Sequence, residues 1–129
     1  MRLLLDSNIV VPIARKERDK LGAQVSLLLS VGSNDIFVSI ASLWEIAIKS
    51  RLGKLSLNAP LRELPDIIAS YGYTLLAVDR HHAVEDLVDQ PSAKDPFDRM
   101  LLAQCQVEDI RVVTTDRTLT GHTLTWRTA

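Results

Sequence analysis

Short apolar runs and longer amphipathic segments alternate along the whole chain. The runs that predict strands cover residues 2–5, 36–38, 73–78 and 111–115, and an alternating segment at 123–126 predicts an edge strand. Helical periodicity covers residues 9–14, 21–31, 41–51, 61–71, 80–87 and 95–108, with a charged connection at 15–20 and a loop at 91–94. Because strands that alternate with helices form mostly parallel sheets, we expect an α/β fold that binds its ligands beyond the carboxyl ends of the strands.

Composition narrows the class of protein. The length of 129 residues predicts one domain that spans residues 1–129. Hydrophobic residues make up 47% and charged residues 24%, which excludes disorder and a coiled coil. A single cysteine, Cys105, excludes an internal disulfide and a cysteine-rich zinc site. Since the chain has neither a secretory signal pattern nor an apolar stretch of about 20 residues, we expect a cytoplasmic protein with no membrane segment.

The balance of charge gives no direct indication of a partner. Fifteen basic and sixteen acidic residues leave a net charge of −1, so any evidence for a polyanionic ligand must come from local clusters. Lys49, Arg51 and Lys54 form one such cluster. Together with Lys94 and Arg99, these side chains are candidates for contacts with phosphate groups.

Two aspartates follow predicted strands directly. Asp6 ends the run of three leucines at the first strand, and Asp116 follows the β-branched strand near the end of the chain. Each has an ordinary structural explanation, because aspartate commonly occupies turns and helix N-caps. Their shared position at strand ends nevertheless places both at the edge of the sheet where ligands bind.

Two more acids lie on predicted helices. Glu45 lies in a mostly apolar helix, where a capping box with Ser42 or an ion pair with Lys49 would explain it without a function. Asp98 fits a first-turn acid that the helix dipole favours, but it shares a stripe with core-facing residues at +3, +4 and +7. Asp95 fits the N-cap of that helix, since a proline follows it at the first helical position.

The four acids together suggest a metal site. Two strand ends and two helix faces would bring Asp6, Glu45, Asp98 and Asp116 to one edge of the sheet. Several carboxylates at close range repel one another, and a divalent cation neutralises that repulsion. Oxygen-only ligands suit Mg²⁺ or Mn²⁺, the metals of phosphoryl chemistry.

Four motifs, in this order, resemble those of PIN-domain ribonucleases. They are residues 3–8 (LLLDSN), 41–49 (ASLWEIAIK), 95–104 (DPFDRMLLAQ) and 113–116 (VTTD). The chain is most similar to the VapC-like toxins of type II toxin–antitoxin pairs, and the resemblance covers essentially its whole length. The second and third motifs, in this order and spacing, carry most of its specificity.

The resemblance implies a PIN-like three-layer sandwich with a central, mostly parallel sheet flanked by helices. It implies metal-dependent endonucleolytic cleavage of RNA by a metal-activated water, with Asp6, Glu45, Asp98 and Asp116 as catalytic metal-binding residues around Mg²⁺ or Mn²⁺. Ser7 would hold a water or a phosphate oxygen, and Asp95 would help to position the metal ligands without binding the metal itself. The implied partner is a small VapB-type antitoxin whose tail covers the site, and we also expect a homodimer.

Two other functions are compatible with the same residues. A non-catalytic PIN-like interaction module would use the acids only for structure. An aspartyl phosphatase would use Asp6 as nucleophile, but that chemistry needs a second acid two residues later, where Asn8 stands. Dependence of RNA cleavage on both metal and Asp6 separates the nuclease from these two alternatives.

Remaining candidates for chemistry receive structural interpretations. His81 and His82 have no partner at metal-ligand spacing and predict the start of a surface helix. Trp44 and Trp126 are expected in the core or at an interface rather than as platforms for stacked bases.

Overall fold

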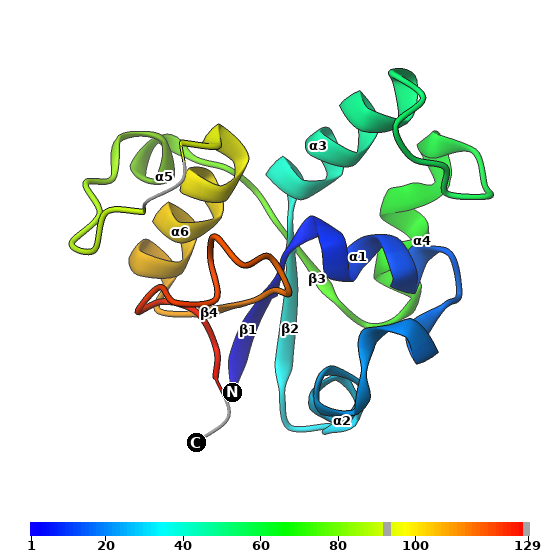
Figure 1. Ribbon diagram of the computed structural model, residues 1–129, viewed down its shortest axis with the longest axis horizontal. Coiled ribbons are helices and arrows are strands. Elements are labelled where there is room, and N and C mark those ends of the chain that lie inside the picture. The colour runs from blue at the N-terminus through cyan, green and yellow to red at the C-terminus, as the bar shows by residue number, and fades with distance from the viewer. Residues whose placement is uncertain (92–93, 128–129) are drawn as a thin grey trace.

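A four-stranded parallel sheet forms the centre of the computed structural model, which describes residues 1–91 and 94–127 (Figure 1). Its strands are β1 (Arg2–Leu5), β2 (Asp35–Ser39), β3 (Thr74–Leu76) and β4 (Arg111–Val113). The order is β3-β2-β1-β4, and every pairing is parallel. β1 is therefore a central strand, with Leu4 opposite Phe37 on one side and Val112 on the other.

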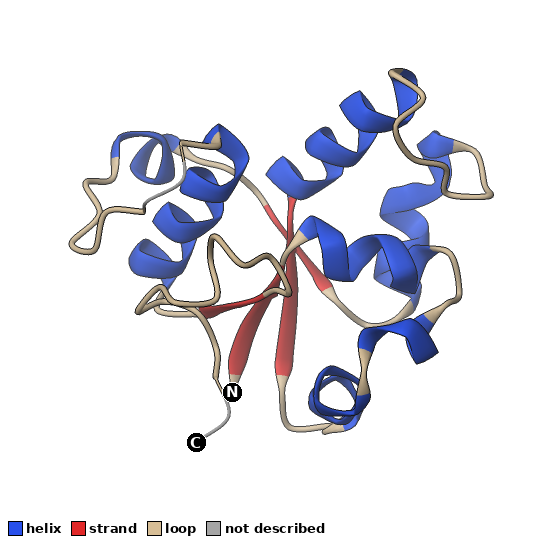
Figure 2. Cartoon of the chain, in the orientation of Figure 1, coloured by secondary structure: helices blue, strands red, loops and turns tan. Residues whose placement is uncertain are grey.

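Helices cover both faces of this sheet. They are α1 (Ser7–Ala14), α2 (Ala23–Ser30), α3 (Ile40–Arg51), α4 (Leu64–Ser70), α5 (Arg80–Val84) and α6 (Pro96–Glu108), with 3-10 helices at Arg18–Leu21 and Leu61–Glu63. Figure 2 shows α5 and α6 on one side of the strands and α1 to α4 on the other. Among the described residues, every helix falls short of the length and apolar character that crossing a bilayer requires.

Alternate side chains of β1 enter two separate apolar clusters. Leu3 and Leu5 belong to the cluster that contains Ile13 of α1, on one face of the sheet. Leu4 belongs to the cluster that contains Leu102 of α6, on the other face. Each of these leucines is fully buried, and burial of such a side chain stabilises the fold by about 1.5–3 kcal/mol. The continuous apolar run in β1 is thus explained by burial on both faces, which confirms the expected three-layer arrangement.

The helical segment predicted at residues 21–31 is interrupted near its start. Gly22 has a φ of +83°, a conformation that favours glycine, and it separates the 3-10 turn ending at Leu21 from α2. The charged connection at 15–20 accordingly contains the start of that 3-10 helix. A similar break occurs at residues 61–63, because Pro65 has no N–H to donate to the carbonyl of Leu61.

Several other predicted boundaries differ from the structure. The segment 123–126 forms no strand, and its pairing is one isolated bridge between Thr125 and Val112. β3 covers only three residues, and α5 ends at Val84 instead of residue 87. The loop predicted at 91–94 includes residues 92–93, which lie outside the described part of the chain.

Candidate metal centre

Asp6 stands where β1 ends and α1 begins. It is the N-cap of α1, and its Oδ1 accepts a 2.7 Å hydrogen bond from the backbone N–H of Ser7. Its Oδ2 accepts a second bond of 2.7 Å from the hydroxyl of Thr114, just beyond β4. The side chain is 3% exposed. The structural explanation expected for Asp6, a residue of a turn or N-cap, is therefore confirmed. The same hydrogen bonds hold its carboxylate at the carboxyl edge of the sheet.

Asp116 is held by the loop that follows β4. Its Oδ1 accepts hydrogen bonds from the backbone N–H and the hydroxyl of Thr118, at 3.0 and 2.9 Å. Its own backbone N–H donates to Oγ1 of Thr114 at 2.9 Å. Thr114 thus connects Asp6 with Asp116, a relationship that the sequence analysis did not identify.

Asp98 and Asp95 have different surroundings on α6. Asp95 is exposed and caps the helix, with Oδ1 accepting from the backbone N–H groups of Phe97 and Asp98 at 2.8 and 3.3 Å. The N-cap interpretation of Asp95 is therefore confirmed. Asp98 is only 6% exposed, and among the described residues its carboxylate has no hydrogen-bond donor. A buried carboxylate in that situation either takes up a proton or is compensated by a positive charge.

Three carboxylates converge at this edge. Asp6, Asp98 and Asp116 each offer one oxygen, and these oxygens lie within 4.8 Å of one another. The donor set contains only carboxylate oxygen, which fits Mg²⁺ or Mn²⁺ better than the softer metals that histidine and cysteine select.

The mutual proximity of these acids changes their titration. Burial, followed by the charges of Asp95, Asp6, Asp116 and Glu45, raises the pKa of Asp98 to about 7. Burial also raises the pKa of Asp6, although the hydrogen bonds from Thr114 and Ser7 oppose that effect. The centre thus carries an energetic cost for its negative charge that a bound cation would relieve.

Glu45 lies beside this group without joining it. It is 4% exposed, and its Oε2 is 2.9 Å from Nζ of Lys49, the ion pair that its spacing allowed. The alternative capping box is wrong, because Ser39 is the N-cap of α3. The hydrogen bond from Lys49 to Glu45 raises the pKa of the lysine, with smaller contributions from the charges of Asp95 and Asp6. Lys49 is therefore a fixed cation at the border of the carboxylate centre.

Two hydroxyl side chains beside the acids complete the surroundings. Ser7 follows Asp6, and its Oγ is 3.5 Å from Oδ1 of that residue. Ser42 lies one helical turn before Glu45 and is fully buried, and its Oγ has no hydrogen-bond partner within the described residues. The sequence analysis considered Ser42 only as a cap, and its spacing of three residues from Glu45 was the signal that it shares the inward face of α3.

A second group of potential ligands has a structural explanation. The ring of His82 is 2% exposed; its Nδ1 accepts from the backbone N–H of Asp79 at 3.0 Å, and Nε2 lies 2.9 Å from Oε1 of Glu108. The helix start predicted at this pair is confirmed, since α5 begins at Arg80, and His81 is exposed, but the expected surface position of His82 is wrong. Both ring nitrogens are engaged, and the contact with Glu108 joins α5 to α6.

The arrangement defines an α/β protein with an acidic, oxygen-only centre at the carboxyl edge of a parallel sheet. The PIN domain family matches residues 3–121, and the chain belongs to this family. Among solved structures, a chain from "Crystal structure of VapBC2 from Rickettsia felis bound to a DNA fragment from their promoter" has a TM-score of 0.63 and 16% sequence identity. The match covers 97% of this chain and 96% of that chain, and it supports the fold. A comparison with curated proteins finds no match.

Proposed function

We propose that the chain is a metal-dependent endoribonuclease, the toxin of a type II toxin–antitoxin pair. The observation that carries this proposal is the convergence of Asp6, Asp98 and Asp116 within 4.8 Å at the carboxyl edge of a PIN domain. Three buried or half-buried acids at this range are costly, and their cost is explained if they hold a divalent cation.

The proposed ligands of Mg²⁺ or Mn²⁺ are Asp6, Asp98 and Asp116, with Glu45 beside them. Once bound, the cation would lower the pKa of a water and neutralise charge that develops on the phosphodiester. Thr114 and the N–H of Ser7 fix the orientation of the Asp6 carboxylate.

Other side chains would act on the water and the substrate. Glu45 would orient the attacking water or accept its proton; its charge acts on Asp98, which supports this, although it is not one of the three grouped acids. Ser7 would hold a water or a phosphate oxygen, and Asp95 supports Asp98 by capping α6. Lys49 supplies a positive charge for the phosphate backbone.

The proposal includes a partner and a setting. The solved structure with the same fold is named as a VapBC2 complex bound to promoter DNA. By analogy, we propose a small VapB-type antitoxin as partner of this chain, together with a homodimer, a single nuclease domain over residues 1–129 and a cytoplasmic location.

Cleavage of purified cellular RNA tests the proposed activity. We expect endonucleolytic products with Mg²⁺ or Mn²⁺, none with EDTA, and none from Asp98→Asn. Asp66→Asn, which changes an exposed acid in the first turn of α4, is the matched control and should cleave normally. Cleavage that persists in EDTA would overturn the metal mechanism.

The same preparation separates the alternatives. Hydrolysis of a phosphomonoester without RNA cleavage would favour the aspartyl phosphatase. Tight binding of a partner with no turnover of either substrate would favour the non-catalytic module.

A further inference from the structure

Two valines at the end of α5 are the most exposed of the large apolar side chains that the structure describes. Val84 is 82% exposed and Val88 is 93% exposed. Between them, Leu87 is buried in the apolar cluster that contains residues of β1 and α6, so it anchors this stretch to the core. A single exposed valine would need no explanation, but two on one anchored stretch, rimmed by polar groups, are typical of a protein interaction surface.

The stretch is held in a fixed shape although residues 85–90 form neither helix nor strand. Oε1 of Gln106, on α6, accepts a 2.9 Å hydrogen bond from the backbone N–H of Val88. Nε2 of the same side chain donates to Oε2 of Glu85 at 3.1 Å and to the carbonyl of Asp86 at 2.9 Å. One amide group thus joins the residue after Val84 to Val88, and it keeps the two valines on one short piece of surface beside α6.

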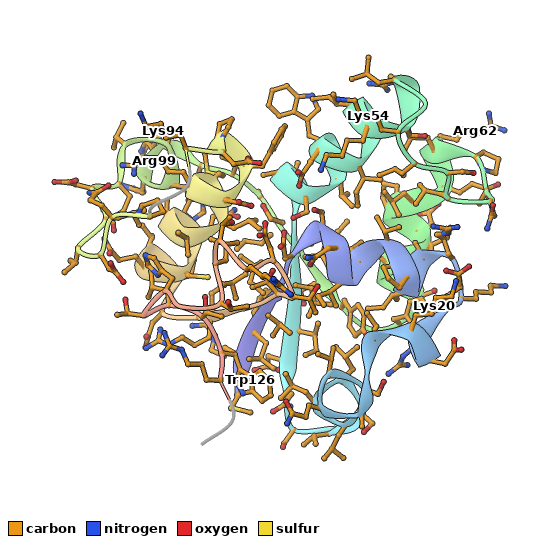
Figure 3. All side chains as sticks on the ribbon, viewed as in Figure 1. Lys20, Lys54, Arg62, Lys94, Arg99 and Trp126 are labelled. Carbon is orange, nitrogen blue, oxygen red and sulfur yellow. The ribbon has the colours of Figure 1, made fainter. Side chains whose placement is uncertain are left out.

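Gln90 fixes the far end of this stretch. Its Nε2 donates to the carbonyl of Leu87 at 2.7 Å and to Oδ1 of Asp86 at 3.2 Å, and its Oε1 accepts from Arg99 at 3.0 Å. Figure 3 shows Arg99 and Lys94 on the α6 side of the molecule. Because these bonds form without a partner, the surface is preformed, which lowers the entropy cost of binding.

Three acids give the same stretch a negative charge. Glu85, Asp86 and Asp89 lie within five consecutive residues. In the part of the chain that the structure describes, no lysine or arginine forms an ion pair with any of them. Their charge therefore remains available to a partner, and it attracts cations and repels nucleic acid.

We propose that residues 84–89 form a docking surface for a protein segment that carries lysine or arginine together with apolar side chains. The valines supply the apolar contact, and the acids select a partner of opposite charge. The surface shares no residue with the carboxylate centre, and Gln106 lies eight positions after Asp98, about 12 Å along α6. The inference therefore stands independently of the proposed nuclease function.

Titration of the isotope-labelled chain, followed by nuclear magnetic resonance, tests this surface. The probe is a short soluble peptide of lysine, valine and glycine. One matched peptide has glutamate in place of every lysine, and another has serine in place of every valine. We expect the first peptide to shift the backbone signals of Val84, Glu85, Asp86 and Val88, with a Kd at least about fivefold lower than that of either matched peptide.

Two double variants separate the apolar and the charged contributions. Val84→Ser with Val88→Ser should raise the Kd of the first peptide at least about fivefold. Glu85→Gln with Asp86→Asn should raise it by a similar factor and make it less sensitive to salt. The amides of the second variant keep an oxygen that can accept the bonds from Gln106 and Gln90, so we expect the stretch to retain its shape.

Two substitutions elsewhere on the surface serve as matched controls. Leu27→Ser changes an apolar side chain of α2 that is 67% exposed, and Asp66→Asn changes an exposed acid of α4. Both should bind the peptide as wild type does. Because every altered side chain is at the surface, we expect all variants to fold, and circular dichroism checks this.

Four outcomes would overturn the inference. The first is the absence of any shift at millimolar peptide, and the second is equal affinity for the three peptides. The third is a set of shifts confined to Asp6, Asp98 and Asp116, which would place the lysines at the carboxylate centre. The fourth is a wild-type dimer that dissociates when Val84 and Val88 become serine, which would assign the surface to a second copy of the chain.

Discussion

The hydroxyl of Thr114 donates a 2.7 Å hydrogen bond to Oδ2 of Asp6, across the ends of two paired strands. The hydroxyl oxygen of Thr114 also accepts a 2.9 Å hydrogen bond from the backbone N–H of Asp116. One threonine therefore sets the position of two of the three converging carboxylates. Groups that orient metal ligands in this way contribute to metal affinity without touching the ion.

Replacement of Thr114 tests that contribution. Thr114→Val keeps the shape of the side chain and removes both hydrogen bonds, so the affinity for Mn²⁺ should fall by about 10- to 100-fold. Isothermal titration calorimetry measures the change. Thr120→Val, which alters an exposed threonine whose hydroxyl donates to the carbonyl of Arg117, is the control and should bind Mn²⁺ normally. Equal affinities in wild type and Thr114→Val would show that the hydroxyl does not orient the site.

The two aspartates of the α6 N-terminus should respond differently to the same change. Asp98→Asn removes a proposed ligand, and RNA cleavage should fall by about 100-fold or more. Asp95→Asn retains an N-cap, because asparagine caps helices about as well as aspartate, so cleavage should change little. Initial rates at saturating Mg²⁺ measure both effects. Similar losses in the two variants would make Asp95 part of the centre itself.

The raised pKa of Asp98 predicts how the metal-free protein responds to pH. Its pKa rises from 3.8 to about 7 on folding, so between these values the native state binds more protons than the unfolded state. The free energy of unfolding should therefore fall as pH rises from about 4 to about 7, and Asp6 acts in the same direction.

Thermal melts in EDTA across this pH range, for wild type and Asp98→Asn, measure the effect. The variant should lose less stability over the range, and near pH 8 it should be the more stable protein by about 1 kcal/mol. If stability depends on pH in the same way in both proteins, ionisation of Asp98 does not destabilise the metal-free centre.

Glu45 should matter more for turnover than for metal affinity. It is paired with Lys49 and lies outside the group of three oxygens, so Glu45→Gln should weaken Mn²⁺ binding by less than about tenfold. If Glu45 orients the water or accepts its proton, kcat should fall by about 100-fold or more. Calorimetry and cleavage kinetics on one preparation separate the two quantities. A loss of Mn²⁺ affinity as large as that of Asp98→Asn would make Glu45 a direct ligand.

Local rules predicted much of this structure. The run of leucines before Asp6 identified the first strand, and Asp95 followed by Pro96 identified the start of α6, because both signals depend only on neighbouring residues. The convergence of Asp6 with Asp116 followed from the rule that parallel strands end at one edge.

What the sequence could not supply depends on distant partners. His82 is buried by a contact with Glu108, 26 residues away, and Thr114 reaches Asp6 across 108 residues. The sequence also left open whether Trp44 lies in the core or at an interface, and the structure shows that its side chain is exposed. Gly22 differs from these residues because its effect is local. A glycine inside a helical pattern can either continue or interrupt the helix, and only its positive φ shows that it interrupts this one.

The position of β4 beside β1 has a consequence for the timing of synthesis. Asp6 leaves the ribosome 108 residues before the threonine that holds it, and β1 lacks its neighbour on that side until β4 has been made. At about 5–20 residues per second, the interval is roughly 5–20 seconds. A nascent chain therefore carries Asp6, and later Asp98, before Thr114 and Asp116 complete the centre. Translation itself therefore delays the assembly of the proposed nuclease, whose proposed substrate, RNA, surrounds it from the first residue.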